Sequence, residues 1–222
     1  MLDVVLHGSA WQLDAAAPWL PIQRRLTAPA GRRYLVGWAG ESAMHVLTPR
    51  VLARRASNVE GSLEMLMLAP SALFTRRLVA AENPAFPESA GVRGFRRTLQ
   101  WAWLLEGAGQ YFSGQANHVR PAVARRLREG PPPKFPPGRR DAPLLGGTVF
   151  DLLAREQDES ACVALARAPL DAGANALLES AFGGRRAEET EAVWRRHLAR
   201  LAEPGQVIRR ASRRPRRSPP RQ

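Results

Sequence analysis

A single glutamate lies in a strongly apolar stretch near the middle of the chain. Residues 101–114 read WAWLLEGAGQYFSG, and Glu106 is the one carboxylate among these tryptophans and leucines. Trp103, Glu106 and Gln110 recur at spacings of three and four residues, which predicts a helix over about residues 96–113 that is apolar around most of its circumference. A buried carboxylate is costly unless it is protonated, ion-paired or bound to a metal. Glu106 is therefore the first candidate for chemistry, as a metal ligand or as half of a buried ion pair.

The stretch around Glu106 resembles the W-L-x-E-G-x-A-x-Y-x-S-G helix of gluzincin-type zinc metallopeptidases, the peptidase MA-like group. Weaker similarities follow in the segments LGGTVFDLL (145–153), ALLESAFG (176–183) and EETEAVW (188–194). The resemblance implies a zincin-like fold, in which a small sheet comes before the catalytic helix and a helical part follows the glutamate helix. It also implies that Glu106 stands where those enzymes have their third zinc ligand.

The zinc site that this resemblance implies is incomplete here. In such enzymes the other two ligands come from an H-E-x-x-H motif on an upstream helix, and residues 68–82, where that helix would fall, contain no histidine. A catalytic zinc needs about three converging protein ligands and a base beside its bound water. We therefore expect a metallopeptidase-like domain without zinc, another cofactor or catalytic residues, acting as a structural or ligand-binding module.

An arginine could take the place of the metal beside Glu106. Arg76 and Arg77 lie on the segment that would otherwise carry the histidines, and a guanidinium there would neutralise the buried carboxylate. We call the residues expected around this place the relic pocket: Glu106, Trp103, Tyr111, Arg76 and Arg77. The alternative is that this pocket still binds a peptide or a small ligand without cleaving it.

The four histidines do not pair with one another at helical spacing. His45 lies in a strand pattern and His118 at the start of a helical one, so a metal site of unusual composition, made of His45, Glu106 and His118, stays open. Such a site would make the chain a hydrolase with a rearranged metal centre. Signatures of serine hydrolases and of phosphate-binding loops are missing from the sequence.

The positive charge is concentrated at the carboxyl end. The chain has a net charge of +13, and residues 209–222 contain seven arginines and no acid, which leaves +6 for residues 1–208. Lys134 is the only lysine, and this preference for arginine is typical of a GC-rich genome. A second function is therefore open, nonspecific binding of nucleic acid through phosphate contacts. The arginines concerned are Arg209, Arg210, Arg213, Arg214, Arg216 and Arg217.

The patterns along the chain predict an α+β fold that is mostly helical. Residues 2–7, 33–38 and 43–48 read as three strands of a small amino-terminal sheet. We expect one metallopeptidase-like domain over residues 1–208, followed by a disordered arginine-rich tail over residues 209–222.

Helical patterns prevail after residue 50. Ser62 and Thr148 are candidate N-caps, and Pro70 should divide or kink the first of these helices. The stretch 130–138, with five prolines, should be extended. Besides the helix that carries Glu106, we expect helices over residues 118–129, 144–153, 159–168, 172–182 and 187–202.

Cys162 is the only cysteine, so the chain can form no internal disulfide. Its apolar helical surroundings favour a buried, inert thiol. The absence of a disulfide and of a secretory signal at the start of the sequence favours a cytoplasmic location. No apolar run reaches 18 residues, so we expect no membrane span.

Overall fold

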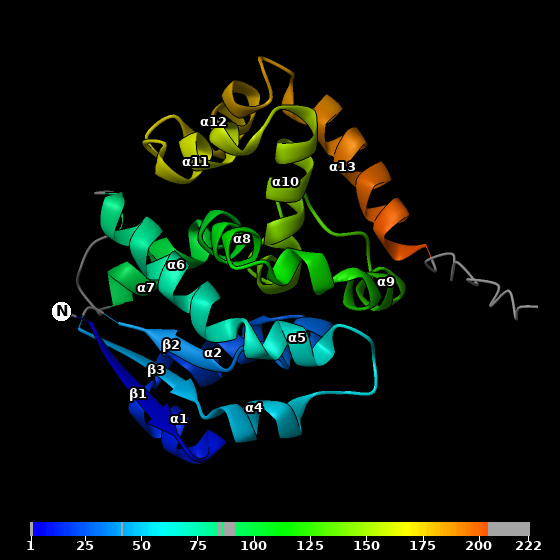
Figure 1. The fold of residues 1–222 in the computed structure, drawn as a ribbon. Coiled ribbons are helices and arrows are strands. Elements are labelled where there is room, and N and C mark those ends of the chain that lie inside the picture. The colour runs from blue at the N-terminus through cyan, green and yellow to red at the C-terminus, as the bar shows by residue number, and fades with distance from the viewer. Residues whose placement is uncertain (1, 41, 84–85, 87–91, 204–222) are drawn as a thin grey trace, which may run out of the picture.

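The computed structural model describes residues 2–40, 42–83, 86 and 92–203 of the chain. The architecture is α+β and mostly helical with a small amino-terminal sheet, which confirms the predicted fold class (Figure 1). The elements, in chain order, are β1 (Asp3–His7), α1 (Ala10–Ala16), α2 (Trp19–Leu26), α3 (Pro29–Arg32), β2 (Gly37–Ala39), β3 (Ala43–Leu47), α4 (Pro49–Arg55), α5 (Ser62–Met67), α6 (Ala69–Glu82), α7 (Val92–Gln100), α8 (Ala102–Phe112), the 3-10 helix η1 (Gln115–His118), α9 (Arg120–Arg128), α10 (Ala142–Glu156), α11 (Glu159–Arg167), α12 (Gly173–Ala181) and α13 (Ala187–Ala202).

The sheet has the strand order β1-β3-β2. β1 runs parallel to β3, with Val5 opposite His45, and β2 runs antiparallel to β3, with Trp38 opposite His45. The strands predicted over residues 2–7 and 43–48 are confirmed, but the strand predicted over residues 33–38 shrinks to Gly37–Ala39. The reason is local, since the amides of Tyr34 and Leu35 still bond to carbonyls of α3 and keep the chain in helical turns.

The prediction of one continuous helix over residues 96–113 is wrong. The structure has two helices, α7 and α8, which meet at Trp101, whose backbone leaves helical geometry (φ −104°, ψ 21°). The two helices have different surroundings, because α7 carries arginines on an exposed side whereas nine residues of α8 are buried. Trp101 itself is buried and marks the point where the chain turns from the surface into the core.

Both predicted N-caps are also wrong. The cap of α5 is Gly61, whose φ of 77° suits glycine, and the Ser62 hydroxyl instead accepts a hydrogen bond from the Ser57 amide. Thr148 lies inside α10, which begins earlier, after Asp141. Pro70 does divide the first helical segment, into α5 and α6. The remaining helix predictions are confirmed by α9, α10, α11, α12 and α13, and residues 130–138 form neither helix nor strand.

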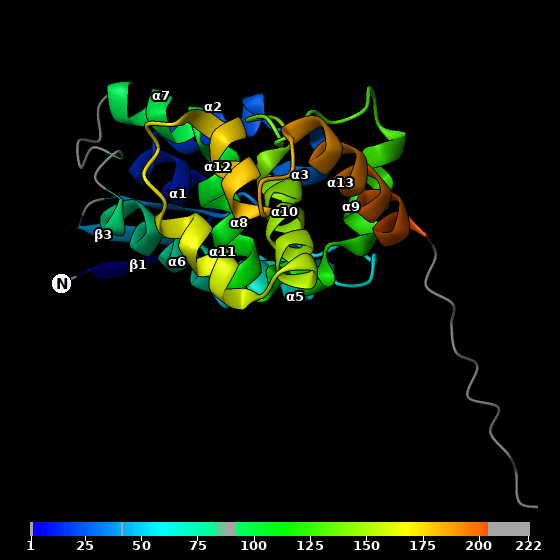
Figure 2. The same cartoon turned by 90° about the horizontal axis from the view of Figure 1, so that it is seen from above.

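The core is built around α8, which lies between α6 and α10 (Figures 1 and 2). The largest cluster of buried apolar residues includes Trp103 and Leu104 of α8, Leu145 and Phe150 of α10, and Trp194 of α13. Helix α8 is apolar on nearly all sides because it has neighbours on nearly all sides. Among the described residues, no helix combines the length and the apolar composition that crossing a membrane requires.

Candidate functional site

Glu106 lies in the middle of α8, and its side chain is only 8% exposed. Its Oε1 atom is 3.0 Å from Nη1 of Arg76, on α6, in an ion pair whose arginine side chain is 12% exposed. The same oxygen accepts a hydrogen bond of 2.9 Å from the side-chain amide of Gln23, on α2. The buried carboxylate is thus neutralised by a guanidinium and held by an amide, and both contacts come from segments far away in the sequence.

Glycines around Glu106 let its neighbouring helices come close. A Cβ atom at Gly109 would lie 2.8 Å from the carbonyl oxygen of Ala72 and 2.8 Å from Cγ of Arg76. A Cβ atom at Gly107 would lie 2.7 Å from the carbonyl oxygen of Gly146 in α10. Helix α8 therefore contacts α6 on one side and α10 on the other through backbone, and Gly109 makes room for the side chain that pairs with Glu106.

Gln110 fixes α8 to the start of α10. Its side-chain amide donates a hydrogen bond of 3.0 Å to the carbonyl of Ala142, and its side-chain oxygen accepts one of 2.8 Å from the Gly147 amide. In the sequence EGAGQ, Glu106, Gly107, Gly109 and Gln110 thus each have a packing or pairing role. These four side chains and backbone positions of α8 are therefore used for assembly of the core.

The cavity beside Glu106 is small. It measures about 30 Å³ and is lined by Arg76, Glu106, Gln110 and residues of the β2 and α6 segments. A volume of this size holds about one water molecule, whereas small-ligand pockets measure about 300–1,000 Å³. The cavity therefore has no room for a peptide.

The structure brings together only part of the predicted relic pocket. Glu106 and Arg76 are in contact, but Trp103, Tyr111 and Arg77 do not line the cavity. The ring of Tyr111 packs against Phe112 and Phe150 instead. Burial raises the pKa of the Tyr111 hydroxyl, with a smaller contribution from Cys162.

Sequence reasoning missed Gln23 and the anchoring role of Gln110. Gln23 is only 4% exposed. It lies three residues after Leu20 and four residues before Thr27, so these three buried residues form one stripe that begins on α2. A glutamine on the apolar face of an amphipathic helix is the signal that could have found it, because a buried amide needs partners.

The residues proposed as an unusual metal site do not converge. Nδ1 of His45 lies 3.0 Å from Nε2 of His7 on the sheet, whereas His118 lines a different hollow of the surface. Burial, and then the neighbouring His7, lower the pKa of His45. In the described part of the chain, no three histidine, cysteine or acidic side chains are grouped closely enough to hold a metal ion. The predicted metal site made of His45, Glu106 and His118 is therefore wrong, because the fold separates its members.

The groups around Glu106 do not fit a zinc ion either. A structural or catalytic zinc takes thiolate, imidazole or carboxylate ligands. The two groups in contact with Glu106 are both N–H donors, and one of them is a permanent cation. This donor set stabilises a carboxylate and disfavours a dication at the same place.

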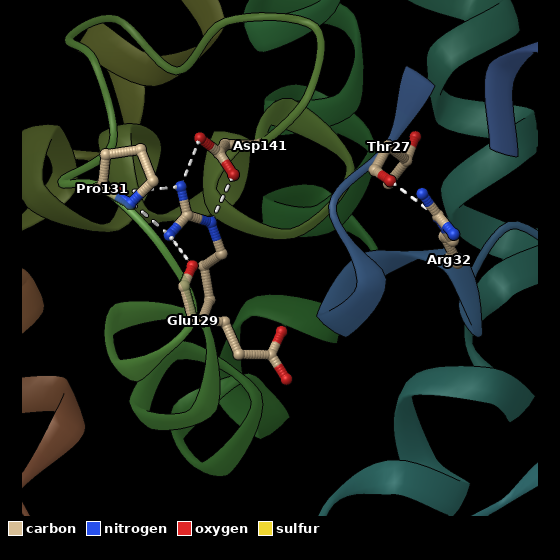
Figure 3. A network of polar contacts seen from close by, with 6 residues as sticks. Thr27, Arg32, Glu129, Pro131 and Asp141 are labelled. Carbon is tan, nitrogen blue, oxygen red and sulfur yellow. Dashed lines mark hydrogen bonds and ion pairs between the residues drawn. The ribbon is translucent and has the colours of Figure 1, made fainter. Parts of the chain in front are cut away.

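A second buried arginine is also used for assembly. Arg126 of α9 is 2% exposed, and its Nε and Nη2 atoms donate to the two carboxylate oxygens of Asp141 at 2.5 and 3.0 Å. Its remaining donors reach the carbonyls of Glu129 and Pro131, at 2.9 to 3.3 Å. Figure 3 shows Glu129, Pro131 and Asp141 converging on one guanidinium group. This network ties the end of α9 and the proline-rich segment to the start of α10.

A larger groove lies between α9, the turn before α5, and the end of α13. It measures about 990 Å³, which is within the range that small ligands occupy. Its charged lining is mixed, with Arg33, Arg120 and Arg128 facing the same space as Glu60 and Glu64. Such a lining indicates no single class of ligand. The groove does have the volume that the Glu106 cavity lacks.

Comparison of the chain with protein-family models, with curated proteins and with solved structures gives no match. The arginines proposed to hold nucleic acid, between residues 209 and 217, lie outside the described residues. The nucleic-acid hypothesis therefore stays a prediction from the sequence.

Proposed function

We propose that this chain is a metallopeptidase-like module without catalytic activity, in which the place of a metal is taken by a side chain of the protein itself. The single observation that carries the proposal is the buried ion pair of Glu106 with Arg76. In a site made for a cation, a carboxylate needs a positive partner, and the Arg76 guanidinium supplies it at 3.0 Å.

The neighbouring groups support a structural rather than a catalytic role. Gln23 occupies a second position around the carboxylate and contributes an N–H donor, so it can act neither as a zinc ligand through that group nor as a general base. Hydrolysis of a peptide also needs space for both the scissile bond and a water molecule. The cavity of about 30 Å³ has room for the water molecule alone. We infer that Glu106 holds α2, α6 and α8 together, and that any binding role of the module is exercised elsewhere on its surface.

Metal content and peptidase activity test this proposal together. The purified chain is incubated with excess zinc, passed over a desalting column and analysed by elemental mass spectrometry, and its hydrolysis of a quenched fluorescent peptide library is recorded. We expect less than stoichiometric zinc and no hydrolysis above the buffer rate. The variant Glu106→Gln is the matched control, since it removes the one carboxylate. One tightly held zinc per chain that disappears in Glu106→Gln would overturn the proposal.

A further inference from the structure

Strand β1 has a partner on one side only among the described residues. The amide of Asp3 bonds to the carbonyl of Ser42, at 2.8 Å, and the carbonyl of His7 accepts from the amide of Thr48, at 3.0 Å. Along a strand, successive backbone groups point to opposite edges, so residues 3, 5 and 7 face β3. The N–H and C=O groups of Val4 and Leu6 therefore point to the free edge of the sheet.

In the described part of the chain, this free edge is apolar and exposed. Val4 and Leu6 are 56% and 57% exposed, and Val5 is 38% exposed. Natural edge strands are commonly guarded by lysine, proline, a bulge or a covering element. The segment DVVLH contains neither lysine nor proline, and its pairing with β3 is regular over all five residues. Figures 1 and 2 show β1 at the margin of the molecule, on the side of the sheet away from α8 and α10.

We propose that β1 pairs antiparallel with β1 of a second copy of this chain, so that two three-stranded sheets join into one of six strands. The self-complementarity of the strand argues for this occupant. In an antiparallel pair centred on Val5, each Val4 lies opposite Leu6 of the second copy. These are the residues whose free backbone groups point outward, so both can form the closely spaced pair of hydrogen bonds.

The charges of the strand fit the same register. With Val5 opposite Val5, the carboxylate of Asp3 lies opposite the imidazole of His7 of the second copy. This is a position without backbone hydrogen bonds, where side chains of the two strands are closest. When His45 donates its hydrogen bond to Nε2 of His7, the proton of the neutral His7 ring sits on Nδ1, which can donate to that carboxylate. The pairing thus places the Asp3 carboxylate of each copy opposite the His7 imidazole of the other, once at each end of the paired strands.

This inference rests on β1 alone and is independent of the proposal for Glu106. The chain is studied by sedimentation velocity over a range of concentrations, and we expect reversible dimerisation. The variants Val5→Lys and Val5→Asp each place like charges face to face on the two-fold axis, which should weaken the dimer more than about tenfold. A mixture of the two variants should restore it, because lysine then meets aspartate. Charge changes at Val163, an exposed valine on α11, are the matched control and should have no effect.

A cysteine at the axis tests the register directly. Val5→Cys should form a disulfide-linked dimer under mild oxidation, whereas Val163→Cys should not, and the native Cys162 is buried in either case. A chain that stays monomeric at every concentration contradicts the proposal. So does a dimer that both charge variants leave intact, because that dimer uses another surface. A dimer that is broken by each charge variant but is not restored by mixing them contradicts the stated register.

Discussion

At the scale of single residues, Arg126, which is buried, and Arg76, which is largely buried, both pair with acids, but their remaining hydrogen-bond donors are satisfied to different degrees. The guanidinium of Arg126 has hydrogen bonds from all three of its nitrogens, to Asp141 and two carbonyls. Nε of Arg76 is buried without a partner, beside a cavity that has room for a water. Removing one member of a buried pair leaves an uncompensated charge, which costs more than the pair itself contributes. Both arginines can therefore be tested by the same logic.

Replacing Arg76 by methionine should strongly destabilise the fold. The change keeps the apolar stem but leaves the Glu106 carboxylate buried with only the Gln23 amide as partner. We expect the free energy of unfolding in urea to fall by about 3–5 kcal/mol. The double variant Arg76→Met, Glu106→Leu should recover much of this loss, because it buries no charge. Equal stability of the two variants would contradict this, because it would show that the Glu106 carboxylate does not depend on Arg76 for its stability in the core.

Replacing Arg126 by methionine should also lower stability, by about 3–5 kcal/mol, since it leaves the Asp141 carboxylate and two carbonyls without their donor. The neighbouring Arg125 is the matched control. It is half exposed and pairs with Glu129 across one helical turn, so Arg125→Met should cost about 0–1 kcal/mol. Urea unfolding of both variants checks the difference, and similar losses would contradict the structural role given to Arg126.

The single thiol should be inert in the folded chain. Burial raises the pKa of Cys162 to about 11, although a hydrogen bond from Tyr111 works in the opposite direction. The thiolate is the reactive form, so at pH 8 the native protein should react slowly with a thiol reagent such as Ellman's reagent and the urea-unfolded protein rapidly. Since the pKa is raised from 9.0, this group also lowers stability as the pH rises from 9 towards 11. Rapid and complete labelling of the native chain would contradict this burial.

At the scale of elements, the close contact of α8 with α10 depends on paired glycines. Gly107→Ala would place a methyl group 2.7 Å from the Gly146 carbonyl oxygen, in a contact that backbone cannot relieve without moving the helices apart. We expect a loss of about 1–3 kcal/mol in thermal or urea unfolding. Gly138→Ala is the control, because nothing lies within 4 Å of its Cβ position and the residue is exposed. If both variants unfold alike, the helix contact is looser than the structure indicates.

The elements that could be predicted are those with a strong periodicity of apolar residues or with a clear helix-breaking residue at their end. Helix α13 has the predicted bounds, and Pro70 divides α5 from α6 as expected. The errors fall where tertiary contacts decide. Thr148 has the side chain of a cap but sits inside α10, where its hydroxyl donates to the carbonyl of Leu145 and accepts from the indole of Trp194. A local pattern cannot foresee a partner 46 positions away.

The same limit applies to the candidate site. The sequence identifies Glu106 because a carboxylate amid tryptophans and leucines requires a partner, and it offers Arg76 or Arg77, on the segment that forms α6, as one such partner, the alternative being a metal ion. It cannot choose between Arg76 and Arg77, since that choice depends on how α6 is rotated about its axis. Gln23 is further out of reach, because it lies 83 positions before Glu106 and only the tertiary fold brings the two side chains together.

At the scale of the whole molecule, charge is the property that separates the body from its carboxyl end. Residues 1–208 carry +6 of the total +13, and within the described residues some of the arginines are paired with acids, as in the surface pairs of α10 and α13. Affinity for nucleic acid through phosphate contacts depends on cations that are free to replace counterions. The density of positive charge without acids is highest in residues 209–222, so we expect most of any such affinity to reside there.

Truncation tests this division of charge. We expect the full chain to bind a short DNA duplex at low salt, with an affinity that falls steeply and linearly in a plot of log K against log salt concentration. The variant ending at residue 208 should lose most of this affinity and have a much shallower slope, because seven positive charges are removed. Fluorescence anisotropy over a salt series measures both quantities. A third variant, with the arginines between 209 and 221 replaced by glutamine, separates charge from chain length, since it should behave like the truncated chain. If the truncated chain keeps the slope of the full chain, the phosphate contacts come from the folded body, and the surface arginines of α7 and α9 become the residues to replace.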